Sequence, residues 1–291
     1  MGVDLQRARG VAVAAAQAAG AVIRGAWGTG GAGKGVQHKG AMDLVTETDR
    51  RCEELIFEQL KGAFPDHRFV GEEETAQLGA VPALTAAPTW LVDPLDGTTN
   101  FVHNFPFTCV CIGLAVEREV ALGVVYNPVL DELFVGVRGA GATLNGEPIR
   151  VSDTGRLSSA LVATELGVHR DRETMDATFR RVQALAGGAR SLRCSGSCAC
   201  NMTSVACGRL DAFYEIGFGG PWDCAAAAVI VREAGGEVLD PEGEAFDVMS
   251  RRVLATNGKL SAEVATILKG AGTAASEPQA PGPRAETQQA G

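Results

Sequence analysis

The stretch 90–101, WLVDPLDGTTNF, constrains this chain more than any other part of its sequence. It begins with an apolar run that predicts the end of a buried strand, after which Asp93 and Asp96 flank a rigid proline. Gly-Thr-Thr follows at 97–99, the composition of a helix N-terminus whose free backbone N–H groups can hold an anion. Because the stretch contains no Lys or Arg, the two carboxylates would repel each other unless a cation lay between them. Hard oxygen ligands of this kind indicate Mg²⁺.

Three further stretches belong with this one. They are 43–49 (DLVTETD), 71–73 (GEE) and 221–223 (PWD). Together with 90–101 they resemble the signatures of the inositol monophosphatase family, in the right order, and the resemblance covers nearly the whole chain. Motifs that support one another in this way argue against a chance match.

The resemblance implies a mixed α/β fold, the layered α-β-α-β-α sandwich of the sugar phosphatases. It also implies Mg²⁺-dependent hydrolysis of sugar or polyol phosphate monoesters by metal-activated water, with two ions, inhibition by Li⁺, and a homodimeric enzyme. By motif position the first ion is held by Glu72, Asp93 and the Leu95 carbonyl, and the second by Asp93, Asp96 and Asp223. The catalytic residues implied are Glu72 and Thr98, which orient the water, and Asp49, which supports Thr98 together with Glu73.

The substrate is expected to lie between the metals and a sugar pocket. The residues expected to contact it are Glu72, Leu95, Asp96, Gly97, Thr98, Gly196, Ser197, Cys198, Glu215 and Asp223. In the family, residues at the position of Glu215 accept hydrogen bonds from sugar hydroxyls, and a lysine at the position of Lys39 lies near the metal-bound water. The expected substrate is myo-inositol 1-phosphate. The segment 215–223 is one residue longer than in several strict inositol phosphatases and resembles the branch that also hydrolyses L-galactose 1-phosphate.

Composition excludes other classes of protein. A content of 46% hydrophobic residues over 291 positions is ample for a large core. A formal charge of −9 leaves no basic footprint for nucleic acid or an anionic membrane, so a small-molecule phosphate is the expected partner. The alanine-rich segment 11–23 is too short and too Gly-interrupted to span a bilayer. Eight cysteines without a signal peptide indicate reduced thiols and a cytoplasmic location.

The chain predicts one catalytic domain over 1–270 and a disordered tail over 271–291, where no large apolar residue occurs. Helices are predicted over 5–27, which ends in the glycine-rich 28–35, and directly after 46–49, where Glu53 is among the residues expected to face water. A further helix is predicted over 171–186, with Met175, Phe179, Val182 and Leu185 on one side. The remaining predicted helices are 201–206, 224–234, which Asp223 would cap, and 259–268. The predicted strands are 68–70, 90–92, an antiparallel meander of 108–116, 120–126 and 133–137, a hairpin at Asn145-Gly146, and 252–255. The segment 75–89 is expected to be a surface excursion.

Other interpretations remain open at this stage. Taken alone, Asp223 could be only a helix N-cap, Glu72 a surface turn residue and Glu215 a solvated strand end. A phosphatase of fructose 1,6-bisphosphate or adenosine 3′,5′-bisphosphate would need basic contacts for a second phosphate, and a non-catalytic metal-binding scaffold would usually lack a ligand. Cys194, Cys198 and Cys200 form C-x3-C-x-C, a spacing that could bind Zn²⁺, but no fourth ligand is near in sequence.

Overall fold

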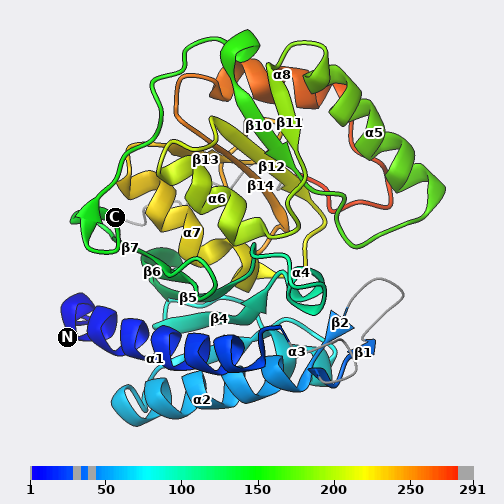
Figure 1. Ribbon diagram of the computed structural model, residues 1–291. Helices are drawn as coiled ribbons and strands as arrows, with labels where there is room; N and C mark the ends of the chain where they lie inside the picture. The colour runs from blue at the N-terminus through cyan, green and yellow to red at the C-terminus, as the bar shows by residue number, and fades with distance from the viewer. Residues whose placement is uncertain (1, 29–33, 39–43, 281–291) are drawn as a thin grey trace, which may run out of the picture.

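The computed structural model describes residues 2–28, 34–38 and 44–280, which stack in the order helix, sheet, helix, sheet, helix (Figure 1). The first helical layer holds α1 (Leu5–Ala26) and α2 (Glu47–Ala63), the middle one α6 (Cys198–Ala206) and α7 (Pro221–Glu233), and the last α5 (Arg172–Ala186) and α8 (Ser261–Ala271). Two short helices, α3 (Glu72–Leu78) and α4 (Thr98–Val102), follow strands at the edge of the first sheet. The predicted α-β-α-β-α sandwich is confirmed. No helix of the described residues combines the length and apolarity needed to cross a bilayer.

The larger sheet contains the predicted meander and hairpin. Within the described residues its strands run in the order β3-β4-β5-β6-β7-β8-β9, with only β3 and β4 parallel. Their bounds are β3 (Arg68–Gly71), β4 (Thr89–Asp96), β5 (Cys109–Val116), β6 (Glu119–Asn127), β7 (Glu132–Val137), β8 (Gly141–Leu144) and β9 (Glu147–Pro148). Both faces are buried: alternate residues of β5 such as Cys111 face α6 and α7, whereas Val110 and Ile112 face α1 and α2.

The smaller sheet was mostly missed by the sequence analysis. Its order is β11-β10-β12-β14-β13, with β10 parallel to both of its neighbours. The bounds are β10 (Leu161–Thr164), β11 (Ser191–Arg193), β12 (Ala212–Ile216), β13 (Glu237–Leu239) and β14 (Arg252–Thr256). Only β14 was predicted outright, because β10, β11 and β13 are shorter than β14 and β12 lacks a clear alternation. A separate pair, β1 (Gln37–His38) and β2 (Leu44–Val45), precedes α2.

A row of glycines fixes the position of α7 on the larger sheet. Gly113, Gly123 and Gly136 are adjacent on β5, β6 and β7. A Cβ on Gly123 would lie 2.0 Å from the Ala226 carbonyl oxygen, so only glycine permits this approach. The close packing brings the first turn of α7, with Asp223, into the cleft that the end of β4 also lines.

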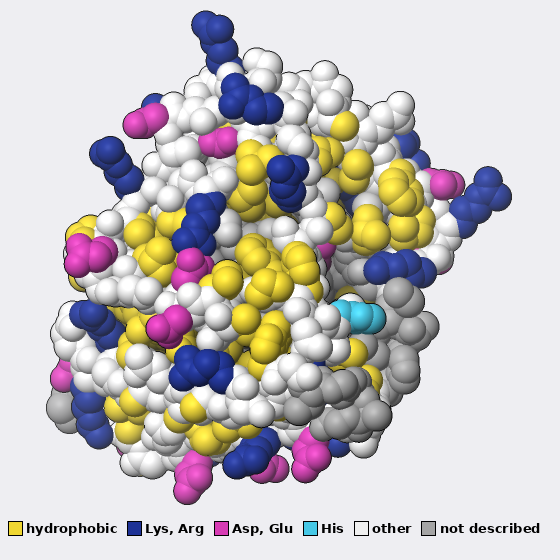
Figure 2. Space-filling view, in the orientation of Figure 1, with side chains coloured by type: hydrophobic (Ala, Val, Ile, Leu, Met, Phe, Trp, Pro, Cys, Tyr) yellow, Lys and Arg dark blue, Asp and Glu magenta, His cyan; other side chains and the backbone are white. Residues whose placement is uncertain are grey.

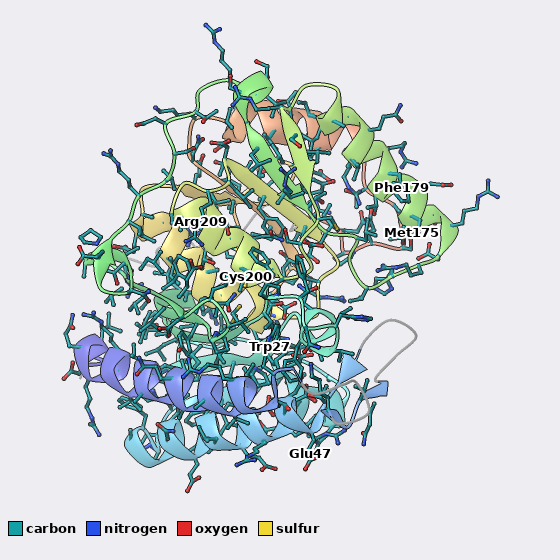
Figure 3. All side chains as sticks on the ribbon, in the orientation of Figure 1. Trp27, Glu47, Met175, Phe179, Cys200 and Arg209 are labelled. Carbon is teal, nitrogen blue, oxygen red and sulfur yellow. The ribbon has the colours of Figure 1, made fainter. Side chains whose placement is uncertain are left out.

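Two predictions about the second half of the chain differ from the structure. On α5 the buried residues are Thr174, Ala177, Thr178, Arg181 and Leu185, while Phe179 is 55% exposed and lies with Met175 on the outer side of the helix (Figure 3). Figure 2 shows hydrophobic side chains gathered over this helix. The prediction of a disordered tail is also wrong for residues 272–280, because Ala274 and Glu277 in this segment are buried. Residues 281–291 and the glycine-rich 29–33 lie outside the described part of the chain.

Candidate functional site

The end of β4 forms the floor of the site. The pairing of β4 with β5 shifts between Asp93 and Asp96, and this bulge contains the proline, which has no N–H to donate. Asp93 is 2% exposed, and its Oδ1 accepts a hydrogen bond from the Leu95 amide at 2.9 Å. The strand is therefore longer than the predicted 90–92, and its irregular end carries both aspartates.

Thr98 connects this strand end to α2. Its Oγ1 lies 3.1 Å from the Leu95 carbonyl oxygen and 3.1 Å from Asp49 Oδ1, and it can donate its one proton to either acceptor. Asp49 also caps α2, since its Oδ2 accepts the Thr46 amide at 2.8 Å. The capping box thus fixes the carboxylate that faces Thr98, and the predicted contact between Asp49 and Thr98 is present.

Asp96 is held from the opposite side of the cleft. Its Oδ2 accepts hydrogen bonds from Ser197 Oγ at 2.6 Å and from the Ala199 amide at 2.8 Å, at the start of α6. Burial raises the pKa of Asp96 to about 6, even though these two hydrogen bonds favour its charged form.

Asp223 lies inside the first turn of α7 and does not cap it. The N-cap is Gly220, and α7 begins at Pro221, a favoured first residue because it lacks an N–H. Asp223 Oδ2 accepts the Gly219 amide at 2.9 Å. The prediction of an Asp223 cap followed by a helix from 224 is therefore wrong by one turn.

Glu72 begins α3, a helix that was not predicted and whose second half falls within the expected surface excursion 75–89. The N-terminus of α3 is capped by a residue of α2: Glu53 accepts the amides of Glu73 at 2.9 Å and Glu74 at 2.8 Å. The prediction that Glu53 faces water is therefore wrong, since it is 6% exposed. Burial raises the pKa of Glu53 to about 7 despite the two amide bonds. Gly71 makes room, because a Cβ there would lie 2.3 Å from Glu53 Oε2.

One cleft of about 330 Å³ brings together the carboxylates of α3, β4 and α7. We call Glu72, Asp93, Leu95, Asp96 and Asp223 its acidic wall. Burial, then the charges of Glu72, Asp96 and Asp223, raise the pKa of Asp93 well above its ordinary value, which shows how closely the carboxylates gather. Among the described residues no Lys or Arg forms an ion pair with Asp93, Asp96 or Asp223. Buried, uncompensated oxygen donors fit a hard divalent cation.

The opposite side of the cleft is made of loops and a strand end. We call the lining residues within 165–170, 196–198 and 215–219 its loop wall. Glu215, the penultimate residue of β12, is 6% exposed, and its Oε2 has no hydrogen-bond partner among the described residues. Burial, then the nearby Glu165 and Asp223, raise the pKa of Glu215 well above its ordinary range. Because this buried oxygen lacks a hydrogen-bond donor and belongs to a residue lining the cleft, it suits a ligand whose hydroxyl groups can donate to it.

Glu165 is the main residue of the site that the sequence analysis missed. Its Oε1 accepts the amides of Ser195 and Gly196 and the Asn201 side chain, each at 2.7 Å. It thereby shapes the predicted Gly196–Cys198 loop. The signal for it was a carboxylate directly after a strand, but β10 itself had not been recognised.

The predicted cysteine motif does not come together as a metal site. Cys194 is exposed, and its thiol donates a hydrogen bond to Glu165 Oε2. Cys198 and Cys200 are buried, and Cys200 lies in the middle helical layer (Figure 3). The one group of potential metal-binding side chains found within 4.8 Å of one another in the described residues is Asp96, Cys109 and Cys111. Lys39 lies outside the described residues.

Known proteins resemble this chain over most of its length. Residues 4–272 match the model of the inositol monophosphatase family. Inositol monophosphatase 3 of Solanum lycopersicum is 59% identical over 251 residues, which cover 86% of this chain and 92% of that protein. Inositol monophosphatase 1 of Homo sapiens is 43% identical over 223 residues, 76% and 80% of the two chains. The solved structure of inositol monophosphatase from Anabaena (Nostoc) sp. PCC 7120 matches with a TM-score of 0.80 at 36% identity, covering 92% of this chain and 97% of that one.

Proposed function

The chain belongs to the inositol monophosphatase family, and from this premise we propose that it hydrolyses myo-inositol 1-phosphate between the acidic wall and the loop wall. It is thus a phosphoric monoester hydrolase. The observation that carries the proposed site has two parts: on one side of a cleft the carboxylates of Asp93, Asp96 and Asp223 gather without an ion pair to a Lys or Arg of the described residues, and among the residues lining its other side Glu215 has an unpartnered oxygen.

The acidic wall would hold Mg²⁺. Glu72, Asp93 and the Leu95 carbonyl would bind one ion, and Asp93, Asp96 and Asp223 a second. When bound, such ions lower the pKa of a ligated water and stabilise the charge of the departing oxygen. The donor set supports this assignment because it consists entirely of oxygens, the ligands that Mg²⁺ prefers. Ser197 and Ala199 would keep one Asp96 oxygen oriented, which leaves the other available to the ion.

Thr98 would orient the attacking water. When its proton is directed to Asp49 or to the Leu95 carbonyl, a lone pair on Oγ1 remains free to accept a hydrogen bond from water. Glu72 would hold the same water from the start of α3. The Gly97 and Thr98 amides would hold phosphate oxygens, since the first N–H groups of α4 have no acceptor within the helix.

The loop wall would recognise the polyol. Glu215 would accept hydrogen bonds from ring hydroxyls, with Gly196, Ser197 and Cys198 lining the same space. Arg170 is the only Lys or Arg among the described residues of the lining, and its Nη1 donates to the carbonyls of Leu166, Gly167 and His169 of its own loop. This arrangement favours a monophosphate over a bisphosphate, because the described lining holds a single cation and part of its donor capacity is used within its own loop.

Phosphate release tests the proposal. The purified protein would be given monophosphates of inositol, L-galactose, glycerol and a nucleotide, and fructose 1,6-bisphosphate, each with Mg²⁺ and with a chelator. We expect Mg²⁺-dependent release that is fastest with a cyclic polyol monophosphate. Release that is unaffected by the chelator would contradict the metal assignment, and a preference for the bisphosphate would contradict the substrate.

We propose further that the enzyme is a cytoplasmic homodimer. All eight cysteines are unpaired thiols, as expected in a reducing compartment, and the family resemblance supports a dimer. Light scattering on the purified chain measures the oligomeric state directly.

A further inference from the structure

The segment 273–279, which we call the C-terminal strap, lies beyond residue 272, where the family match ends. It contains no regular helix or strand and nevertheless packs closely against α5, with Ala274 and Glu277 each only 4% exposed. None of its residues lines the cleft. Any effect on the reaction must therefore pass through the residues that it contacts.

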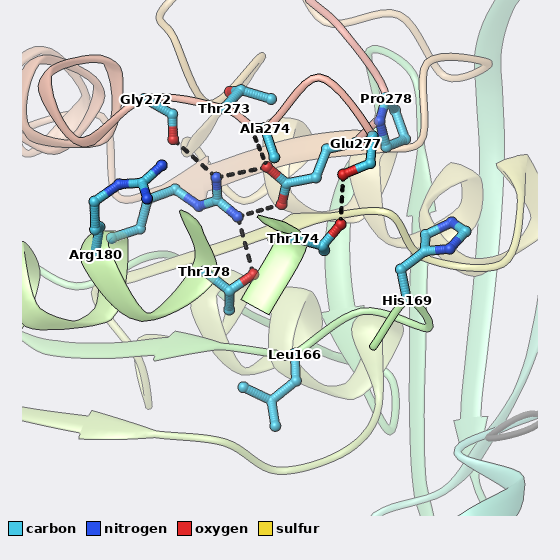
Figure 4. Close-up of polar contacts among 12 residues, drawn as sticks. Leu166, His169, Thr174, Thr178, Arg180, Gly272, Thr273, Ala274, Glu277 and Pro278 are labelled. Carbon is cyan, nitrogen blue, oxygen red and sulfur yellow. Dashed lines mark hydrogen bonds and ion pairs between the residues drawn. The ribbon is translucent and has the colours of Figure 1, made fainter. Parts of the chain in front are cut away.

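A buried ion pair fixes the strap to α5 (Figure 4). Arg181 Nη1 donates to Glu277 Oε2 at 2.9 Å, Nη2 contacts Glu277 Oε1, and both side chains are at most 2% exposed. The Ala274 amide donates to Glu277 at 2.7 Å and closes the turn. On the other side, Arg252 Nη1 donates to the Pro278 carbonyl at 2.9 Å. These contacts give the strap one position.

The strap contacts residues adjacent to the loop wall at two places. At the start of α5, directly after 165–170, Ser276 Oγ lies 2.8 Å from Thr174 Oγ1, and the Ala275 amide donates to Glu173 at 3.0 Å. At the second place, a Cβ built on Gly217 would lie 3.8 Å from both Pro278 Cδ and His169 Cδ2. Gly217 in turn accepts the Val168 amide at 3.3 Å. The strap thus supports both loop segments, 165–170 and 217–219.

We propose that the C-terminal strap is a positioning element that sets the selectivity of the enzyme for ring-bearing monophosphates. The inference rests on the function proposed above. The acidic wall is carried by β4, α7 and the first residue of α3, and none of the strap contacts described above reaches these elements. The segments 165–170 and 217–219 of the loop wall lie between regular elements, and loops with less tertiary support open more readily. Besides the strap, Arg251 holds the second of them by donating to the carbonyls of Gly217 and Phe218. By holding 165–170 and 217–219, the strap keeps the wall that meets the polyol in place.

Two truncations and two substitutions test the proposal. The control stops after Ala280 and removes only 281–291. The test chain stops after Gly272 and also carries Arg181→Met, so that no buried charge is left without its partner. A milder full-length variant, Pro278→Gly, removes the ring beside Gly217 and keeps the ion pair, so it remains informative if the truncated chain does not fold.

Kinetics and hydrogen exchange would both be measured. In the test chain we expect KM for inositol 1-phosphate to rise about tenfold, less than the ~100-fold that a misplaced reacting group can cost. Turnover of glycerol 2-phosphate should stay at the control level, and Pro278→Gly should shift KM in the same direction by less. Amide exchange should become faster at 165–170 and 216–220 and stay unchanged at 93–99.

Exchange also separates this inference from the proposed function, because it needs no turnover. Unchanged exchange at 165–170 in both the test chain and Pro278→Gly would overturn the positioning role even in an active enzyme. An equal loss of activity toward both substrates would overturn it as well. If the control released no phosphate from any monophosphate, the proposed function would fail, and faster exchange at 165–170 would still establish the mechanical role of the strap.

Discussion

The acidic wall and the loop wall of the cleft are built in different ways. The acidic wall comes from short motifs that can each be recognised locally: Asp93 and Asp96 are three residues apart at the end of β4, and Glu72 and Asp223 belong to two further short motifs. The loop wall depends on contacts between distant parts of the chain, such as those of Glu165 with Gly196 and Asn201. In the first wall Asp93, Asp96 and Asp223 form no ion pair with a Lys or Arg of the described residues, so a cation would relieve their charge, whereas the strap that supports the second wall is held by an ion pair and hydrogen bonds that are already formed. Substitutions in the acidic wall and in the strap should therefore have opposite effects.

Asp93→Asn should have the largest effect on activity. Losing the carboxylate common to both proposed ions removes several kcal/mol of charge stabilisation, so kcat should fall by roughly 10⁴-fold. Without metal, however, the variant should be at least as stable as the parent, because burial and the neighbouring carboxylates already raise the pKa of Asp93 well above its ordinary value. Phosphate release with Mg²⁺ and urea unfolding with a chelator measure the two effects. Glu58→Gln, on the exposed side of α2, is the control, and substantial turnover by folded Asp93→Asn would contradict the two-ion assignment.

Glu277→Ala should show the reverse pattern. It leaves the Arg181 guanidinium buried without its carboxylate, and breaking a buried pair in this way costs roughly 3–5 kcal/mol of unfolding free energy. Replacing both partners, as in Arg181→Met with Glu277→Leu, should recover most of that loss because no charge is then buried. Urea unfolding of the parent, the single variant and the double variant gives the comparison. If the single variant were as stable as the parent, Glu277 would not be buried in solution.

The difference between the walls also explains what the sequence could predict. Asp93, Asp96 and Thr98 were found because their spacing carries the chemistry, and the meander was found because β5, β6 and β7 are continuous apolar runs. Glu53 was assigned to water because its place on α2 shows nothing of α3, whose amides it caps. The buried side of α5 was misassigned for a similar reason: Arg181 is buried only because Glu277, far along the chain, folds back to meet it. Partners of this kind are set by tertiary structure, which local periodicity does not record.

Glu215→Ala should sharpen the comparison within the cleft itself. The variant removes the carboxylate that would accept the ring hydroxyls, so these hydroxyls are left without an acceptor in the closed site. We therefore expect a loss of roughly 2–3 kcal/mol in kcat/KM for inositol 1-phosphate and L-galactose 1-phosphate. Glycerol 2-phosphate has no ring and should change far less. Steady-state kinetics on the three substrates decides the matter. An equal fall for all three would mean that Glu215 acts on the acidic wall or on folding.

The smallest effect is expected from Glu53→Gln, which tests whether the carboxylate that caps α3, the helix carrying Glu72 of the acidic wall, is buried in solution. Burial raises the pKa of Glu53 from 4.5 to about 7, so between these values the folded state binds a proton that the unfolded state has lost. The contribution of Glu53 to stability is therefore complete below pH 4.5 and is lost as the pH rises toward 7. Without metal, the unfolding free energy of the parent should fall across this window by roughly 1–2 kcal/mol more than that of the variant, since screening by water reduces the full effect. Urea unfolding with a chelator at several pH values gives the two slopes. Other carboxylates of the cleft contribute equally to both proteins and cancel in the difference, so parallel slopes would place Glu53 in water, where the sequence analysis had put it.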